Sequence, residues 1–197
     1  VGLIGVIDFD KVSLSNIHRQ TLYTTKDVGK FKVKVLKKKL NLINEEVNVK
    51  IYNKKANDKN LINIINKYDI IVDGSDNFKT KFLLNKFSLK FKKKLIVGAI
   101  SKFDGHIFTF DFNKKNTPCL KCFYQTEPSD EFLNCESEGI LGSTANIVGS
   151  IQANEVLKIV LGIGKSLKSN ILILDFLNLN FRKVLFKKRK KCICKKV

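Results

Sequence analysis

The sequence predicts an α/β fold with a Rossmann-like, mostly parallel sheet that carries helices on both faces and is extended by antiparallel strands. Short apolar runs alternate with helical periodicity over the first hundred residues, which is typical of a parallel sheet. After residue 101 the pattern changes to an Asp-Gly hairpin signal and paired strands. A chain of 197 residues with 44% hydrophobic residues can bury one good core, so we expect a single domain over residues 1–197.

The first half of the chain reads as a βαβαβ series. Residues 3–7 form a short apolar run, and residues 27–44 place apolar side chains at helical spacing with lysines on the other face. Alternation over 47–51 predicts a second strand. Apolar residues at 61–65 mark another helix, and the run 69–73 is a third, buried strand.

The second half begins with a polar turn, a helix over 78–91 and a strand over 95–99. Asp104-Gly105 predicts a hairpin within 102–112. Periodicity is then lost over 113–142, a length that usually marks a functional loop.

Near the end of the chain we expect one long helix and a last strand pair. The helix runs over 143–161, with Ser143 as its cap and Gly162 just past its end. Small residues within it permit close packing: Gly149, Ser150 and Ala153. The strands follow at 171–176 and 181–186.

The charge and the cysteine content limit the possible partners and the cellular compartment of the protein. The net charge of +19 comes almost entirely from lysines spread among Asn, Ile and Phe, so we attribute much of it to base composition and expect no specific nucleic-acid partner. No apolar run reaches membrane-span length and no signal peptide is visible, so we expect a soluble, cytoplasmic protein. Five cysteines in this pattern favour a reducing compartment.

Polar residues after the first strand suit a nucleotide. Asp8 and Asp10 offer carboxylates for ribose hydroxyls at the carboxyl end of the strand. Asn16 and Arg19, three positions apart, offer an amide and a guanidinium for phosphate. A strand followed by a solvated loop is the alternative.

A second carboxylate, Asp76, follows the strand at 69–73. With Asp8 it can face one crevice, where magnesium bound together with nucleotide phosphates would supply the positive partner. Alternatively, Asp76 caps the helix that begins near Phe78. Lys32 lies on the helix after the first strand and can in principle reach a phosphate.

The cysteines form two close pairs and a single residue. Cys119 and Cys122 have a metal-ligand spacing, and Cys192 and Cys194 supply two further thiols, which together suit tetrahedral zinc. Free thiols are the alternative, since the second pair is C-x-C. Cys135 is either a buried small hydrophobe or a nucleophile.

Several of these motifs, in this order, resemble the MoeB/ThiF family, bacterial relatives of the ubiquitin-activating enzymes. The resemblance covers essentially the whole chain and is strongest to the molybdopterin-synthase-activating branch. The segments that carry it are 8–21, 28–32, 72–77, 118–122, 149–153 and the terminal cysteines.

The resemblance implies an adenylyltransferase that uses ATP and Mg²⁺ to activate the C-terminal glycine of a ubiquitin-like sulfur carrier, and that forms a homodimer. It implies nucleotide and magnesium contacts for seven residues: Asp8, Asp10, Asn16, Arg19, Lys32, Asp76 and Asn77. It implies structural Zn²⁺ on the four paired cysteines, and in some members the counterpart of Cys135 forms a thioester or disulfide link to the carrier.

Two departures keep other hypotheses open. The second cysteine pair is one residue short, and the family's glycine-rich turn should precede Asp8 by about twenty residues. We therefore expect the N-terminal βα unit to be missing from this sequence. A non-catalytic, decayed relative that binds a carrier or dimerises remains an alternative, as does an NAD-dependent oxidoreductase on a similar fold.

Overall fold

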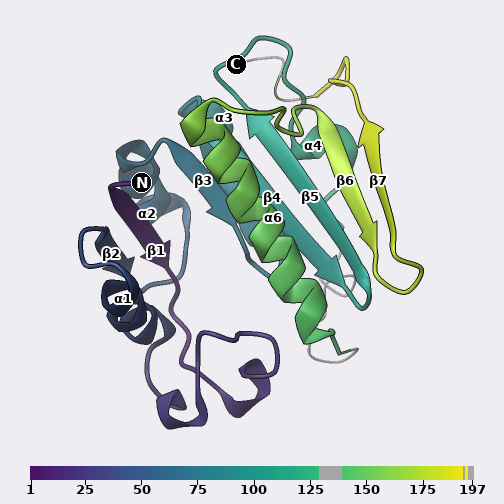
Figure 1. Cartoon of the computed structure of the whole chain (residues 1–197). Coiled ribbons are helices and arrows are strands. Elements are labelled where there is room, and N and C mark those ends of the chain that lie inside the picture. Colours follow the sequence, from purple (N-terminus) through teal and green to yellow (C-terminus); the bar gives the residue numbers. More distant parts are fainter. Residues whose placement is uncertain (129–138, 193, 195–197) are drawn as a thin grey trace. The chain divides into compact units, whose positions relative to one another are not determined.

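The computed structural model describes residues 1–128, 139–192 and 194 (Figure 1). The chain divides into two compact units, Val1–Asn57 and Asp58–Val197, and each is described by itself. Both units combine strands with helices, which confirms the predicted α/β class.

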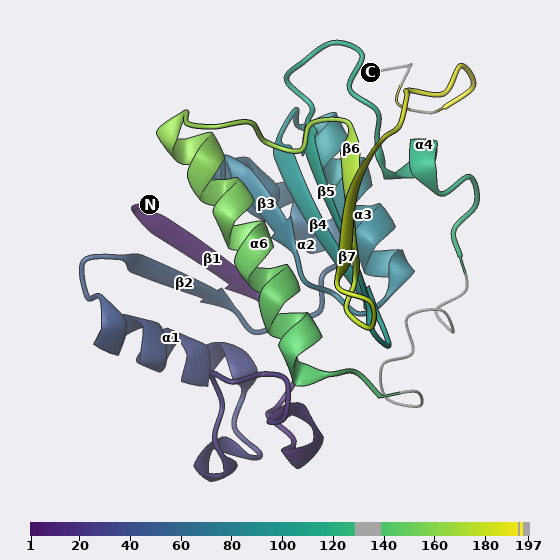
Figure 2. The ribbon, with the colours of Figure 1, turned by 45° about the vertical axis from the view of Figure 1, so that its right-hand side comes forward.

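The first unit is built on a pair of parallel strands. β1 (Leu3–Ile7) and β2 (Asn48–Tyr52) pair along their whole lengths. α1 (Lys32–Ile43) packs against β2 and supplies the parallel crossover between the strands (Figure 2). Two short 3₁₀ turns lie between β1 and α1: η1 (Leu14–Asn16) and η2 (Thr25–Asp27).

The helix of the first unit starts five residues later than predicted. Gly29 has φ +84°, a left-handed conformation that interrupts a helix, and its N–H donates to the Val12 carbonyl at 2.8 Å. Lys11 and Phe31 then form an antiparallel bridge. The backbone before Lys32 therefore pairs with the segment after β1 instead of coiling.

The second unit contains a five-stranded sheet in the order β3-β4-β5-β6-β7. β3 (Ile70–Asp73) and β4 (Lys94–Ser101) are parallel. The remaining neighbours are antiparallel: β5 (Asp104–Asp111), β6 (Asn170–Asp175) and β7 (Asn180–Leu185). The antiparallel extension predicted after residue 101 is thus confirmed.

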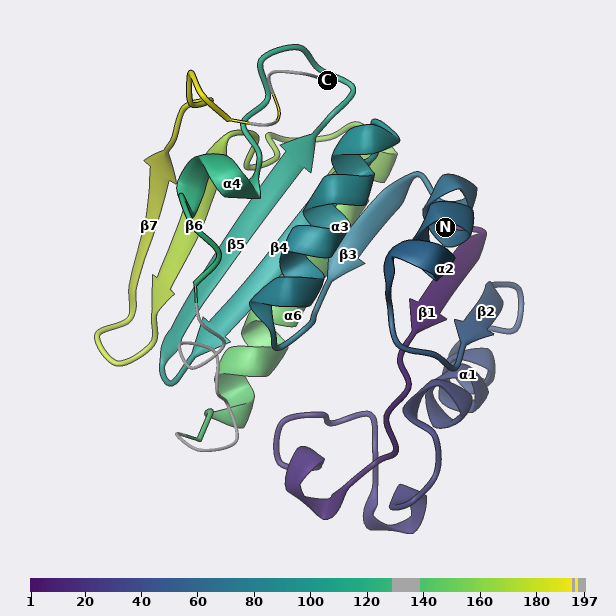
Figure 3. The ribbon, with the colours of Figure 1, turned by 180° about the vertical axis from the view of Figure 1, so that it is seen from behind.

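Helices cover both faces of this sheet, as predicted. α6 (Gly142–Leu161) lies across one face (Figure 1), and α3 (Phe78–Lys90) lies on the other beside the short α4 (Leu120–Phe123) (Figure 3). α2 (Asp58–Ile64) continues into the turn η3 (Ile65–Lys67). Among the residues the structure describes, no helix combines the length and the apolar character needed to cross a membrane.

Each face of the sheet has its own apolar core. The core under α6 is aliphatic: Ile96, Ile107, Val148, Leu167 and Leu174. On the face under α4, aromatic rings pack edge to face: Phe108, Phe110, Phe123, Tyr124 and Phe186. Burial on both faces fixes β4 and β5 as the centre of the unit.

The sequence suggested a hairpin turn at Asp104-Gly105, but the turn lies elsewhere. β4 extends to Ser101, so the turn is Lys102-Phe103 and Gly105 belongs to β5. A Cβ atom on Gly105 would lie 2.6 Å from Val148 Cγ2 of α6. The glycine is needed because the helix packs closely on the strand, not because the chain turns there.

The ends and packing of α6 also differ in part from the prediction. Leu141 is the N-cap, without a side-chain hydrogen bond, so Ser143 does not cap the helix. Gly162 does end it, in the left-handed conformation. The three small residues are exposed and do not set the distance to the sheet: Gly149, Ser150 and Ala153.

Candidate functional site

Asp8 lies at the carboxyl end of β1, where a parallel strand presents a ligand. Its Oδ1 accepts a hydrogen bond from the Asp10 N–H at 2.8 Å, so the chain turns back toward the strand end. Burial raises the pKa of Asp8, while the nearby Lys32 lowers it. The carboxylate is therefore partly desolvated and held in one orientation.

Lys32 is the cation nearest to these carboxylates. Its N–H donates to the Asp10 carbonyl at 2.9 Å, and its Nζ lies 3.2 Å from Asp10 Oδ2. The residue is only 8% exposed, which is unusual for a lysine. The backbone pairing that delayed α1 places this ammonium at the end of β1, which helical spacing alone did not predict.

The buried side chain of Tyr23 lies next to the backbone of Lys32. Its hydroxyl donates to the Lys32 carbonyl at 3.4 Å. Burial, followed by the charges of Asp8 and Asp27, raises its pKa to about 12, so the ring remains a neutral donor.

Asn16 and Arg19 lie on the turn that follows η1. Asn16 is buried, and its Oδ1 accepts from the Ser13 N–H at 3.3 Å. Arg19 donates from Nη1 to the Ser15 carbonyl at 2.8 Å, and its N–H donates to the Asn16 carbonyl at 3.2 Å. The chain turns tightly after η1, and local hydrogen bonds fix both side chains.

In the second unit, Asp76 and Asn77 follow β3. Asn77, not Asp76, is the N-cap of α3, because its Oδ1 accepts from the Thr80 N–H at 2.8 Å. The alternative reading of Asp76 as the helix cap is therefore wrong. Asp76 is exposed, and its Oδ1 accepts a hydrogen bond from the Asn77 side-chain amide at 3.2 Å. This hydrogen bond orients the carboxylate.

A buried ion pair that the sequence did not reveal supports this turn. Lys81 Nζ lies 3.0 Å from Asp73 Oδ2, and also donates to the Ser75 and Gly98 carbonyls at 2.6 Å each. Gln152 of α6 donates to the Asp73 carbonyl at 2.8 Å. The only sequence signal for this network was the polar end of an apolar strand, since Lys81 is one lysine among many.

A cavity of about 340 Å³ opens beside the start of α3. Its walls are mainly apolar: Phe78, Ala99, Ile100, Ser101, Asp104, His106, Tyr124 and Pro128. Burial lowers the pKa of His106, and the charge of Arg182 acts in the same direction. Phe78 follows Asp76 and Asn77 in sequence, so the cavity adjoins the turn after β3.

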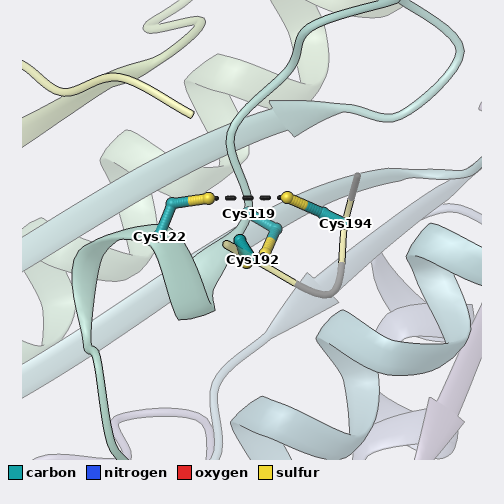
Figure 4. Close-up of side chains that lie close together, drawn as sticks. All are labelled: Cys119, Cys122, Cys192 and Cys194. Carbon is teal, nitrogen blue, oxygen red and sulfur yellow. Dashed lines mark hydrogen bonds between the residues drawn. The ribbon is translucent and has the colours of Figure 1, made fainter. Parts of the chain in front are cut away.

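Four cysteines gather beside α4 (Figure 4). Their sulfur atoms all lie within 4.8 Å of one another: Cys119, Cys122, Cys192 and Cys194. Two contacts cross between the pairs, at 3.6 Å for Cys119–Cys192 and 3.5 Å for Cys122–Cys194. The C-x-C spacing therefore allows the sulfur atoms of both Cys192 and Cys194 to join the cluster.

The sulfur cluster fits a tetrahedral metal ion. Zinc–sulfur bonds of about 2.3 Å give sulfur–sulfur edges of about 3.8 Å, close to the contacts across the pairs. Burial and the neighbouring thiols raise the pKa of Cys119 to about 12, and burial also raises that of Cys194. A metal ion bound at the centre would lower these pKa values and favour the deprotonated thiolates.

Cys192 differs from Cys119 and Cys194 because its pKa is lowered, and Cys135 is not part of the described cluster. Burial, which raises the pKa of Cys192, is outweighed by hydrogen bonds from the other cluster cysteines, which lower it. Cys135 lies outside the described residues, so its predicted role as a thiol stays untested.

Together, these features define an α/β protein with charged side chains at strand ends and a four-cysteine cluster. The model of the ThiF family matches residues 1–196, and the chain belongs to that family. It is 38% identical over 196 residues to the sulfur carrier protein adenylyltransferase of Thermus thermophilus, covering 98% of this chain and 72% of that protein. It is also 38% identical over 183 residues to a probable molybdopterin-synthase adenylyltransferase of Gracilaria tenuistipitata var. liui.

Solved structures confirm the Rossmann-like fold. MccB of E. coli, crystallised with MccA-N7isoASN, superposes with a TM-score of 0.84 at 20% identity and covers 98% of this chain. MccB with ATP gives a TM-score of 0.81. The chain spans 59% of each MccB chain and 51% of the Gracilaria protein.

Proposed function

We propose that this chain is an adenylation domain that uses MgATP to activate the C-terminal glycine of a ubiquitin-like sulfur-carrier protein. One observation supports this most directly. The buried Lys32 ammonium sits against carboxylates at the end of β1, in a chain 38% identical over 98% of its length to a sulfur carrier protein adenylyltransferase. Molybdopterin and thiamin sulfur pathways are both compatible with this chemistry.

In the first unit, the proposed nucleotide contacts follow from chemistry and placement. Asp8, with Asp10 beside it, accepts hydrogen bonds from the ribose hydroxyls. Asn16, Arg19 and Lys32 hold the triphosphate. Lys32 is already desolvated and anchored by Asp10, so little side-chain freedom is lost when phosphate binds.

In the second unit, Asp76 is the proposed magnesium residue, with Asn77 fixing its orientation. Bound Mg²⁺ would offset the negative charge of the phosphates. The Lys81–Asp73 pair keeps the turn that carries Asp76 in place. The apolar cavity beginning at Phe78 receives the carrier's C-terminal segment.

The proposed reaction is a displacement at phosphorus. A carboxylate oxygen of the carrier's terminal glycine bonds to the α-phosphorus of ATP, the bond from that phosphorus to the bridging oxygen breaks, and pyrophosphate leaves. The products are the acyl-adenylate and pyrophosphate. Because one anion attacks another, Arg19 and Lys32 offset the negative charge of the reactants and position the phosphates.

The cysteine cluster has a structural role in this proposal. Zinc held by the four thiolates joins α4 to the C-terminal segment, and it takes no part in the reaction. Because these four cysteines are free of disulfide bonds, a reducing compartment, the cytoplasm, is the proposed setting. By family analogy, the working form is a homodimer, and Cys135 is a candidate for a covalent link to the carrier.

Carrier-dependent exchange of pyrophosphate into ATP tests the function. The full-length protein is incubated with MgATP, labelled pyrophosphate and sulfur carriers of the molybdopterin and thiamin types. We expect exchange with one of them, and at least about a 100-fold loss in Asp76→Ala and in Lys32→Ala. Unchanged thermal unfolding of both variants would exclude a general loss of structure.

Two results would overturn the proposal. Absence of exchange with every carrier, in protein that binds ATP, would favour the non-catalytic alternative. Full exchange by Asp76→Ala would remove Asp76 from the site. Lys79→Ala, which changes an exposed lysine next to the start of α3, is the matched control and should leave exchange unaltered.

A further inference from the structure

A strongly basic pocket lies beside the cysteine cluster, and the proposed adenylation has no use for it. It has a volume of about 420 Å³. Its lining combines four cationic side chains with one amide and one thiol: Lys121, Arg189, Lys190, Lys191, Gln125 and Cys192. Within residues 1–128, 139–192 and 194, no carboxylate contributes to this wall.

The cations of this pocket are not neutralised within the described part of the chain. The ion pairs of the described residues involve other lysines, and none includes Arg189, Lys190 or Lys191. The ammonium of Lys121 lies 5.7 Å from the centroid of the Phe82 ring, and it forms no ion pair with the described residues. Four like charges around one hollow repel each other, so a bound polyanion would lower the energy of the protein itself.

The shape and the donors favour phosphate over a protein surface. A hollow of about 420 Å³ falls within the size range of small-ligand pockets. Arg189 offers a planar fork and the lysines offer point charges, the two means by which proteins bind phosphate oxygens. A single carboxylate would leave most of the positive charge unmatched, whereas two or three linked phosphates carry enough negative charge to meet it.

The cysteine cluster assembles this pocket from two distant parts of the chain. Lys121 and Gln125 come from α4 and the residues after it, and the remaining lining comes from residues 189–192. Cys119 contacts Cys192 across the two parts at 3.6 Å, and the Arg189 N–H donates to Cys122 Sγ at 3.5 Å. The relative position of the two walls therefore depends on the sulfur contacts (Figure 4).

We propose that this pocket binds linked phosphate groups and that the four-cysteine cluster keeps it assembled. The phosphates belong either to a free polyphosphate or to the backbone of a single-stranded nucleic acid. The residues that line this pocket differ from the proposed nucleotide contacts, which include Arg19 and Lys32.

Calorimetric titration with tripolyphosphate and with a short single-stranded oligonucleotide tests the site. The zinc-loaded protein carries Arg19→Ala and Lys32→Ala in all samples, so that the proposed ATP contacts do not contribute. Adding Lys190→Ser and Lys191→Ser should lower the affinity at least tenfold. The matched control, Lys59→Ser with Lys67→Ser, removes the same charge from exposed positions and should change the affinity less than twofold.

The outcomes separate the sources and can refute the site. A Lys190- and Lys191-dependent affinity for tripolyphosphate identifies a free polyphosphate, and the same dependence for the oligonucleotide alone identifies a nucleic-acid backbone. Removing the metal should weaken binding to the level of the lysine variant. The proposal fails if both double variants bind equally, if the metal makes no difference, or if only an acidic peptide depends on the two lysines.

Discussion

The ammonium of Lys81 lies 3.0 Å from the carboxylate of Asp73, and both side chains are almost completely withdrawn from solvent. Lys81 comes from the first turns of α3 and Asp73 from the end of β3. The same ammonium also donates to carbonyls of the following turn and of β4. One lysine thus ties a helix, two strands and the Asp76 turn together.

Removing this lysine should strongly destabilise the protein. Lys81→Met leaves the Asp73 carboxylate buried without its partner, which costs about 3–5 kcal/mol of unfolding free energy. Chemical denaturation measures the loss. Lys79→Met, on the exposed side of the same helix, should change stability by less than about 0.5 kcal/mol. Equal stability of the two variants would mean that the buried pair contributes little.

A methyl group at Gly98 should disturb the same network from the strand side. The added Cβ would lie 2.6 Å from Gln152 Oε1 and 2.7 Å from its Cδ, so the side chain that donates to the Asp73 carbonyl must move. Gly98→Ala should cost about 1–3 kcal/mol of unfolding free energy.

The control for this substitution lies on α6. A Cβ at Gly149 meets no atom within 4 Å, and alanine is the better helix former by about 1 kcal/mol. Gly149→Ala should therefore leave the stability unchanged or raise it. Thermal unfolding compares the two, and a neutral Gly98→Ala would show that Gln152 can move without loss.

The parallel and antiparallel halves of the fold were predictable because each depends on local patterns. Apolar runs such as 69–73 and 95–99 set the strands, and the Asp-Gly pair signalled antiparallel pairing even though the turn itself lies at Lys102-Phe103. The exact turn was not predictable, because Gly105 is selected by contact with Val148, which is 43 residues away in sequence.

The candidate site residues fall into the same two groups, those visible in the sequence and those decided by packing. Asp8 and Asp76 were identifiable because strand ends are visible in the sequence, and the cysteines because their spacing is visible. Lys81 and Gln152 were not, because burial of a polar side chain is decided by tertiary packing. The later start of α1, which brings Lys32 to Asp10, likewise depends on pairing between segments twenty residues apart.

Stability of the first unit should depend on pH through Asp27. Its carboxylate accepts from the Lys39 ammonium at 2.8 Å and from the Thr24 hydroxyl and N–H, and these bonds hold its pKa well below the usual range. A lowered pKa in the folded state means that the carboxylate stabilises the fold at neutral pH. That contribution is lost as the pH falls from about 4 toward the folded pKa.

Asp27→Asn should therefore be less stable than the parent chain at pH 7. The gap should begin to narrow below about pH 4, where the unfolded carboxyl takes up its proton, and should close only as the pH approaches the lowered folded-state pKa. Urea denaturation at pH 7 and at about pH 2 measures it. Glu45→Gln, an exposed acid of the same unit, should differ little from the parent at either pH. A gap as large at about pH 2 as at pH 7 would show that the shape of the side chain, not its charge, decides the effect.

The cysteine cluster should bind one divalent metal ion per chain. Cobalt is a sensitive probe, because four thiolates in a tetrahedron give intense absorption bands that hexahydrated cobalt lacks. Cys119→Ser or Cys194→Ser should abolish the spectrum and lower the thermal stability, since the metal joins segments 119–122 and 192–194.

Cys135→Ser provides the control for this experiment, because the cluster is complete without that residue. It should give the parent spectrum and the parent unfolding temperature. A chelator should lower the unfolding temperature of the parent and of Cys135→Ser alike, and should leave Cys119→Ser unchanged. A parent chain that takes up no cobalt, or whose stability ignores the chelator, would show that the four thiols pack together as neutral groups without a metal.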